Sequence, residues 1–325
     1  MKNNQSSQPS SPPFGVTDLL LLLTALIWGV NYPLIKFALE DFLPLAFSAP
    51  RFLVASLCMA AALAFSKQGF KVQPRHLFPM FLFGLSSAAI NQSLVTIGMT
   101  YTNAGNAALI LGTSPIFTAV ISRFRKHEHF TSRAVIGLGV AFTGLALIIL
   151  AGGKAIHFAG SLRGDLMLLL AAAFWATYTI GTSHFAHIYG SLKTATIMML
   201  LGTPALWLVS APMLARQNWA AVRMISWVGL IASGVLSIAL CFILWNHCVK
   251  KIGATRSAIY SNIQPVFAML AAYPMIGEIP NWGQVIGAGV VFAGIYLVRS
   301  GTIAHNRAEV IEQEEEEISL GLGKS

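Results

Sequence analysis

Residues 18–28 read DLLLLLTALIW, and residues 165–175, almost half the chain later, read DLMLLLAAAFW. The two stretches share the leading aspartate, four of the next five leucines, an alanine and the closing tryptophan. Each belongs to an apolar run close to the length of about 20 residues that an α-helix needs to cross a bilayer. The pair predicts membrane-spanning helices, one of which occurs in two related copies.

The composition extends this prediction to the whole chain. Of the 325 residues, 55% are hydrophobic and 10% are charged, whereas a soluble domain carries about 25% charged residues. So little charge cannot cover a water-soluble surface, which excludes a soluble enzyme. The net charge of +9 does not indicate a nucleic-acid partner, because the Lys and Arg residues lie between apolar runs, where they determine membrane topology.

Ten apolar runs predict ten spans in an all-α polytopic membrane protein, with short connections typical of helices packed against their neighbours. The runs cover residues 17–37, 45–66, 76–98, 104–123, 133–151, 165–184, 192–214, 225–248, 255–276 and 283–300. The polar segment 1–16 is predicted to be a disordered N-terminal tail without the apolar centre of a signal peptide. Residues 301–325 are predicted to be an acidic, solvated C-terminal tail.

The distribution of basic residues predicts the orientation. An even number of spans places both termini on one side of the membrane. With both termini in the cytoplasm, 15 Lys and Arg residues fall in inside segments and 6 fall outside. Cytoplasmic loops carry the excess of Lys and Arg, so we predict a multi-pass protein of the inner (cytoplasmic) membrane with both termini cytoplasmic.

The internal repeat covers both halves of the chain. Residues 101–150 and 251–300 are identical at 13 of 50 positions, including the pairs Pro115/Pro265 and Phe117/Phe267. We therefore divide the chain into a first repeat at 17–151 and a second at 165–300, with five spans each. An odd number of spans turns the second copy upside down, and inverted repeats are a recurrent plan of secondary transporters with a midplane site.

These motifs resemble those of the drug/metabolite transporter superfamily, in particular its ten-helix EamA-type branch. The resemblance rests on residues 26–32 (LIWGVNY), residues 44–52 (PLAFSAPRF) and the duplicated Pro-x-Phe…Glu pattern at 115–128 and 265–278. It implies a ten-helix fold with a central cavity between two five-helix halves, alternating access, and export of amino acids or related metabolites. The second half departs from the first, with Met198 at the position of Arg51 and Trp175-Ala176 in place of Trp-Gly.

Two stripes of aromatic and polar residues are candidates for a substrate pocket. Trp28, Asn31 and Tyr32 share one helix face, and Trp175, Tyr178 and Thr179 form the corresponding stripe in the second copy. Polar atoms within the bilayer must face protein or a water-filled cavity. The stripes therefore predict either a pocket that stacks on an organic solute or ordinary packing between helices.

Further polar residues lie inside the apolar runs, namely Asn91, Gln92, Ser114, Tyr260 and Gln264. Amides offer donors and acceptors to a zwitterionic solute. Alternatively, they form hydrogen bonds between helices, each of which contributes about 1 kcal/mol.

Arg51 is a charge within a span, at a cost of about 2.5–3.5 kcal/mol if it is central. Three interpretations stay open: it binds a substrate carboxylate, it forms a structural ion pair, or its side chain extends to the outer surface. Pro115 and Pro265 each remove a backbone donor in mid-span, and we predict that they act as hinges.

No motif indicates catalysis, a cofactor or a metal. The sequence His127-Glu128-His129 places neighbouring side chains on different faces, with no further ligand nearby. We therefore predict a secondary transporter of the inner membrane that exports amino acids or related small metabolites by alternating access. Efflux of drugs or other amphiphiles is the alternative, and a channel or a membrane-embedded enzyme are further candidates. The sequence leaves the solute, the coupling ion and the oligomeric state undetermined.

Overall fold

The computed structural model describes residues 15–124 and 158–294, and in addition residues 136, 137, 139, 140, 143, 144, 147, 296 and 297. Within these residues the structure is helical, and no strand occurs. Seven of the described helical stretches are long and apolar enough to span a membrane, and two more are shorter. The chain is thus a polytopic α-helical membrane protein. The predicted fifth span at 133–151 falls largely outside the described residues.

Up to residue 124, the first half contains four helical stretches, in agreement with the first four predicted spans. They are α1 (Val16–Ala38), α2 (Pro44–Phe65), the continuous run of α3 (Pro74–Gly84), η1 (Leu85–Asn91) and α4 (Gln92–Tyr101), and the pair α5 (Ala104–Leu111) and α6 (Ser114–Phe124). The third stretch contains a π-helical segment, η1, and the fourth is interrupted between α5 and α6.

The second half follows the same plan. Its elements are α8 (Phe158–Tyr189), α9 (Ser191–Arg216), the short η2 (Trp219–Ala221), α10 (Met224–Ala232), η3 (Ser233–Leu240), α11 (Cys241–Ile252), α12 (Ala254–Ile259), η4 (Tyr260–Ile263) and α13 (Gln264–Ile276), followed by the helix Trp282–Gly294. The π-helical segment η3 corresponds to η1, and the 3-10 turn η4 interrupts the ninth span where the fourth is broken. The duplication seen in the sequence is therefore also present in the order of elements.

The outer faces of the helices are suited to lipid. In α1, Leu19, Leu23 and Leu26 lie on one face and are 56%, 41% and 41% exposed, whereas Leu21 and Ala25 are buried. Apolar side chains at this helical spacing form a continuous stripe. In a bilayer this stripe contacts lipid tails while the opposite face of α1 packs against protein.

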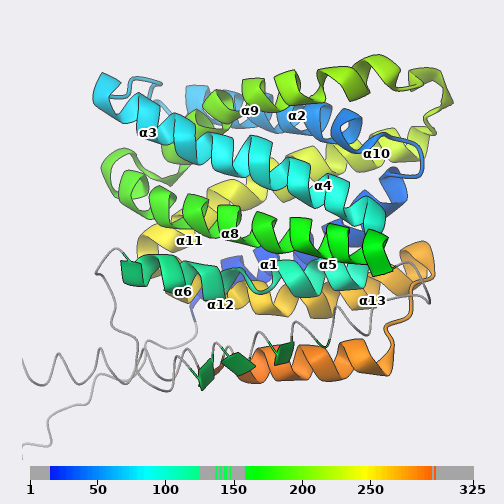
Figure 1. Cartoon of the computed structure of the whole chain (residues 1–325). Helices are drawn as coiled ribbons and strands as arrows, with labels where there is room; N and C mark the ends of the chain where they lie inside the picture. The colour runs from blue at the N-terminus through cyan, green and yellow to red at the C-terminus, as the bar shows by residue number, and fades with distance from the viewer. Residues whose placement is uncertain are drawn as a thin grey trace, which may run out of the picture.

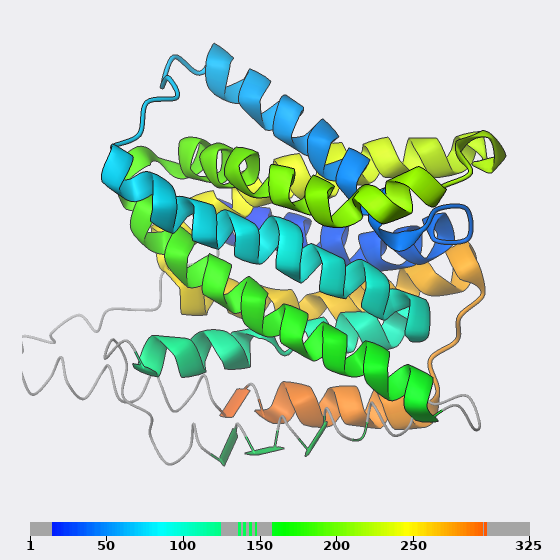
Figure 2. The ribbon, with the colours of Figure 1, turned by 45° about the horizontal axis from the view of Figure 1, so that its top comes forward.

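Helices from the two halves pack against each other throughout the bundle. In Figures 1 and 2, α2 and α9 lie along one edge, α5, α12 and α13 lie toward the other, and α1 and α8 lie between them. The contacts pair corresponding elements: α2 packs on η3 as α9 packs on η1, and α1 packs on α13 as α8 packs on α5 and α6. The two halves therefore form one interlocked bundle.

The two central helices run in opposite directions. Lys36, near the end of α1, donates from Nζ to the Met99 carbonyl of α4 at 2.7 Å. Gly164, near the start of α8, packs closely against Gly98 of the same helix α4. The end of α1 and the start of α8 therefore lie at the same end of the bundle. Both helices cross the bundle from there (Figure 1), so the chain direction of α1 is opposite to that of α8.

Polar contacts mark the two ends of the bundle. At one end, Arg223 before α10 forms ion pairs with Asp41 at 2.8 Å and with Glu40 at 2.9 Å in the loop after α1. At the other end, Lys193 of α9 donates to the Gln68 carbonyl in the loop after α2 at 3.4 Å. Successive loops therefore alternate between the two ends, as the predicted spans require.

Candidate functional site

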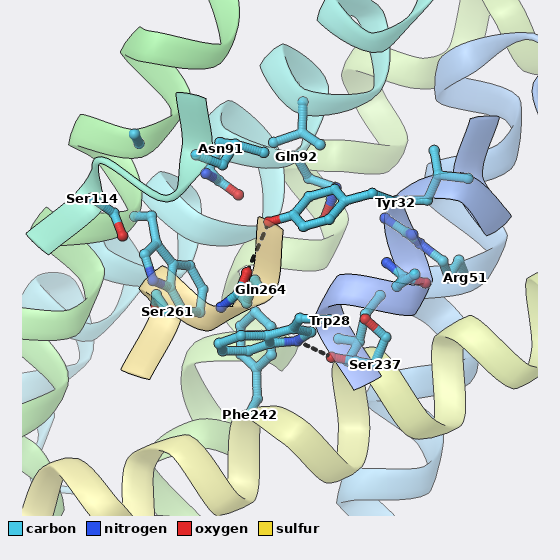
Figure 3. A pocket seen from close by; sticks show the side chains of 17 residues that line it. Trp28, Tyr32, Arg51, Asn91, Gln92, Ser114, Ser237, Phe242, Ser261 and Gln264 are labelled. Atoms are coloured by element: carbon cyan, nitrogen blue, oxygen red, sulfur yellow. Dashed lines mark hydrogen bonds between the residues drawn. The ribbon is translucent and has the colours of Figure 1, made fainter. Parts of the chain in front are cut away.

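A cavity lies between the two halves near the middle of the bundle (Figure 3). Its empty volume is about 670 Å³, which includes open solvent at its mouth. Its wall is built from α1, α2, η1, α4 and the α5–α6 break of the first half, and from α8, η3, α11, η4 and α13 of the second. Both π-helical segments and both interrupted spans thus reach the cavity.

Nine of the twelve predicted site residues line this cavity: Trp28, Asn31, Tyr32, Arg51, Asn91, Gln92, Ser114, Trp175 and Gln264. In Figure 3, Ser114 and Arg51 lie on opposite sides, with Gln264, Trp28 and Tyr32 between them. Sequence reasoning missed the remaining lining residues, which are Ile35, Val95, Leu111, Ala172, Ser237, Ile238, Phe242 and Ser261. Most of these are apolar or small, and nothing in the sequence distinguishes them from other residues of the spans.

Tyr178 and Thr179 do not line the cavity. Both are buried, and the Tyr178 hydroxyl accepts a hydrogen bond from Asn246 Nδ2 of α11 at 3.2 Å. The Tyr178 ring packs against Phe242, with centroids 5.5 Å apart. For these two residues the structure matches the packing interpretation of the second stripe, and within it only Trp175 reaches the cavity.

Tyr260 lies toward one end of the bundle and also does not line the cavity. Its hydroxyl donates to the Asp18 carboxylate at the start of α1. This bond ties η4 of the second half to α1 of the first. The residue that follows Tyr260, Ser261, does reach the cavity, and its hydroxyl has no hydrogen-bond partner within the described part of the chain.

Aromatic side chains from both halves form one wall of the cavity. Trp28 of α1 packs edge-on against Trp175 of α8, with ring centroids 5.2 Å apart, and Phe242 of α11 lies 5.3 Å from Trp175. Trp245 stands behind them, 5.2 Å from Trp28. Aromatic pairs at this separation attract each other beyond their apolar burial, so this aromatic wall joins α1, α8 and α11.

The two hydrogen bonds drawn in Figure 3 connect the halves across the cavity. Trp28 donates from Nε1 to the Ser237 carbonyl at 2.7 Å, and Tyr32 donates to Gln264 Oε1 at 3.0 Å. Ser237 belongs to the π-helical segment η3. A π-helix shifts carbonyls out of the regular α-helical pattern and is frequent at functional sites, so η3 places an acceptor where the indole can use it.

Of the polar cavity residues Asn91, Gln92 and Ser114, the first forms a hydrogen bond between the halves and the other two have free polar atoms among the described residues. Asn91 donates from Nδ2 to the Ala171 carbonyl of α8 at 2.8 Å, which anchors η1 to the second half. The side chains of Gln92 and Ser114 make no hydrogen bond within the described residues. Their polar atoms are thus available to a solute or to water in the cavity.

Arg51 is the charged residue among the described residues of the cavity wall. It is 1% exposed, and its Nη1 donates to Ser233 Oγ of η3 at 3.0 Å. Ser233 Oγ in turn donates to Asn31 Oδ1 at 2.5 Å. Of the sequence interpretations, extension to the outer surface does not describe this buried side chain, and no carboxylate of the described residues forms an ion pair with it.

Both predicted hinge prolines stand just after a break. Pro115 is the second residue of α6, and Pro265 is the second residue of α13. The helix before each proline ends or tightens, at Gly112 and Thr113 in the first half and in η4 in the second. Proline suits the first turn of a helix because its missing N–H has no acceptor there. The breaks agree with the predicted kinks, and their role as hinges stays a prediction.

Comparison with known proteins now identifies the family. The pattern of the EamA-like transporter family matches the chain twice, at residues 15–150 and 162–300. The chain belongs to the EamA-like transporter family. It is therefore a membrane transporter, and the two matches coincide with the two repeats seen in the sequence.

Curated relatives are named as transporters too. The uncharacterized transporter YyaM of Bacillus subtilis is 28% identical over 300 residues, which cover 91% of this chain and 97% of that protein. The uncharacterized inner membrane transporter YedA of Escherichia coli is 28% identical over 301 residues, covering 89% and 91%. A probable terminal-alkyne amino-acid exporter of Streptantibioticus cattleyicolor is 26% identical over 290 residues, covering 88% and 94%.

A solved structure shows the same fold. A crystal structure superposes with a TM-score of 0.66 over 87% of this chain and 96% of that chain, at 17% sequence identity. The likeness concerns the fold of the whole bundle. Together with the family match and the relatives, it establishes a multi-pass transporter of the cell membrane.

Proposed function

We propose that this EamA-family transporter is a secondary transporter that exports amino acids or related small metabolites by alternating access. One observation carries the proposal: corresponding segments of both halves build a single cavity with polar and aromatic walls. A site shared by two related units changes its exposure when one unit tilts against the other. The amino-acid exporter among the relatives favours the same class of solute.

The proposed movement follows from how the halves meet. We take the repeats as inverted, in line with the opposite directions of α1 and α8. The aromatic wall of Trp28, Trp175, Phe242 and Trp245 lies between α1, α8 and α11, so it closes the path when these helices approach and opens it when they separate. The breaks before Pro115 and Pro265 would let corresponding half-helices bend alike.

We further propose that both termini are cytoplasmic and that the protein resides in the inner membrane. The excess of Lys and Arg in the inside segments supports this orientation. In this orientation the Asp41–Arg223 end faces outward, and the Gln68–Lys193 end faces the cytoplasm.

Growth inhibition provides the first test. Cells that overproduce the protein are challenged with toxic concentrations of amino acids and analogues, beside cells that carry the empty vector. The proposal expects resistance to at least one of these solutes and a lower cellular content of it. If resistance extends to none of them, the amino-acid exporter is the wrong function for this transporter.

The mechanism needs a separate measurement. Purified protein in liposomes should carry the identified solute with saturable kinetics, and unlabelled solute on the opposite side should accelerate exchange. Flux that rises linearly with concentration, together with ion currents, would identify a channel.

The drug-efflux alternative has less support. A cationic drug requires an acidic partner in the site, and the described lining residues include no Asp or Glu. The same growth panel, extended to cationic dyes, distinguishes the two classes of solute.

A further inference from the structure

Arg51 is buried and forms no ion pair within the described part of the chain. Its guanidinium has five N–H donors, and among the described residues it donates one hydrogen bond, to Ser233 Oγ at 3.0 Å. Its Nε is buried without a partner within the described part of the chain. The Phe47 ring, 4.9 Å away, and the Phe52 ring, 5.8 Å away, face the cation, but neither accepts its remaining N–H donors.

A buried guanidinium cation is stabilised by an anion nearby. Buried charges in proteins are paired, because an isolated charge loses its hydration without compensation. Among the described lining residues Arg51 alone is charged. No described lining residue therefore supplies the anion, which leaves a solute in the cavity as its source.

Helix packing does not require this arginine. A Cβ added at Gly234 of η3 would lie 2.9 Å from the Arg51 carbonyl oxygen, and a Cβ added at Gly84 of α3 would overlap the Met198 carbonyl oxygen. Arg51 and Met198 thus hold corresponding places, each with its backbone against a glycine of the opposite half. Met198 is fully buried in the apolar core, so the same helix contact forms with a neutral side chain.

A short relay fixes the position of the guanidinium. Ser233 accepts from Arg51 and donates to Asn31 Oδ1 at 2.5 Å. The three residues come from η3, α2 and α1, and Arg51 and Asn31 both line the cavity. The planar guanidinium and the aromatic side chains thus line the same cavity. Arginine forks match the two oxygens of a carboxylate.

We propose that the cavity binds solutes through a single carboxylate, with Arg51 as its counter-ion and with the aromatic side chains of Trp28, Trp175 and Phe242 against the apolar remainder. A single cation suits a single negative charge. Where the solute has an ammonium group, this group would donate hydrogen bonds to the side-chain oxygens of Gln92, Ser114 and Gln264, since no acid lines the site among the described residues. This inference rests on the proposed function and names its class of solute.

Binding to purified protein tests the inference directly. The probes are amino acids and aryl and alkyl monocarboxylates, each paired with its own amide, such as L-phenylalanine with L-phenylalaninamide and phenylacetate with phenylacetamide. The readouts are tryptophan fluorescence and the shift of the unfolding temperature. We expect amides to bind about tenfold or more weakly than the matching carboxylates, because the charge-assisted pair is lost.

Variants assign the preference to Arg51. In Arg51→Met the carboxylate should lose its advantage over the amide, while Arg51→Lys should retain part of it. Arg163→Met is the matched control, because Arg163 is an exposed arginine near the start of α8 that stacks on Tyr101 at 5.4 Å. That control should bind like the wild type. If Arg51→Met does not fold, the carboxylate-to-amide comparison in the wild type and in Arg51→Lys tests the inference instead.

Other results would overturn the inference. It is wrong if no carboxylate of the series binds better than its amide, or if Arg51→Met keeps the preference. Saturable transport of solutes without carboxylate preference would leave the exporter proposal intact and refute this inference alone. Carboxylate binding that depends on Arg51 but is accompanied by no flux would support this inference and contradict the exporter proposal.

Discussion

Trp28 contacts the second half of the chain through both a hydrogen bond and ring packing. Its indole donates to the Ser237 carbonyl, and its ring packs on Trp175 and Trp245. We predict that Trp28→Ala abolishes transport and lowers the free energy of unfolding by about 3 kcal/mol or more, as expected for removal of a packed aromatic ring. Trp28→Phe keeps a ring and loses the hydrogen bond, at about 1 kcal/mol.

Transport in liposomes and thermal unfolding in detergent check this prediction. Trp282→Ala is the control, because Trp282 is 82% exposed and lies away from the cavity. Full transport by a folded Trp28→Ala protein would show that the aromatic wall takes no part in the function.

Asp41 gives the chain a pH dependence at one end of the bundle. Hydrogen bonds from Arg223 and from the Ser226 hydroxyl lower the pKa of the Asp41 carboxyl below its usual value. A lowered folded-state pKa means that the stabilisation is complete above the unfolded pKa of about 3.9 and is lost as the pH falls through the folded value. We predict a drop in the unfolding temperature in this acidic range.

Asp41→Asn should lower the unfolding temperature at neutral pH and flatten its acid dependence. Glu40→Gln is the matched control, since Glu40 pairs with the same arginine at 2.9 Å but its side chain is 58% exposed. Exposed ion pairs contribute little, so this variant should resemble the wild type. Equal effects of both substitutions would contradict a special role for Asp41.

At the scale of elements, the sequence predicted the spans better than their irregularities. Residues 104–123 and 255–276 read as continuous spans, and the structure breaks both before a proline. Pro115 and Pro265 were the available signals, because proline cannot continue a helix without losing a hydrogen bond. The π-helical segments η1 and η3 have no comparable signal, since their form depends on packing against helices distant in the sequence.

Two glycines, Gly84 of α3 and Gly202 of α9, allow these two helices to pack with their backbones in close contact. A Cβ at Gly84 of α3 would overlap the backbone of α9, and a Cβ at Gly202 of α9 would overlap the carbonyl of Gly84. Backbone atoms cannot move aside as a flexible side chain does. We predict that Gly84→Ala and Gly202→Ala each destabilise the protein by about 1–3 kcal/mol or more, the usual cost of overpacking.

Thermal unfolding and the yield of monodisperse protein measure this effect. Gly289→Ala is the control, because nothing lies within 4 Å of a Cβ at Gly289. If Gly84→Ala unfolds at the same temperature as Gly289→Ala, the close contact between α3 and α9 is not present in the protein.

The proposed hinges permit a kinetic prediction. Pro115→Ala and Pro265→Ala restore a backbone N–H next to each break and so favour a continuous, stiffer helix. We expect both variants to bind solute normally and to transport it severalfold more slowly, with the double variant slower still. Pro212→Ala, at an exposed position within α9, should transport normally. Faster transport by the alanine variants would contradict the hinge role.

At the scale of the whole molecule, repeated sequence was the most informative signal. The repeat indicated where the two halves meet, and the polar and aromatic residues within the spans then led to most of the cavity residues. Tyr178 and Tyr260 show the limit of this argument. Each lies in a polar stripe, but Asn246 and Asp18 bind their hydroxyls away from the cavity, and such partners cannot be read from spacing along the chain.

Orientation in the membrane is the last prediction, and it involves both ends of the bundle. The loop with Gln68 and the loop with Asn218 lie at opposite ends, since Lys193 binds the first and Gln217, beside Asn218, donates to Asp41. The excess of basic residues assigns the Gln68 end to the cytoplasm. In a protein whose three cysteines (Cys58, Cys241 and Cys248) are replaced, Asn218→Cys should react with a membrane-impermeant maleimide on intact cells. Gln68→Cys should react after lysis alone, because both positions are exposed to solvent but on opposite sides. The reverse labelling pattern would show that the protein has the opposite orientation in the membrane, with the Gln68 end outside.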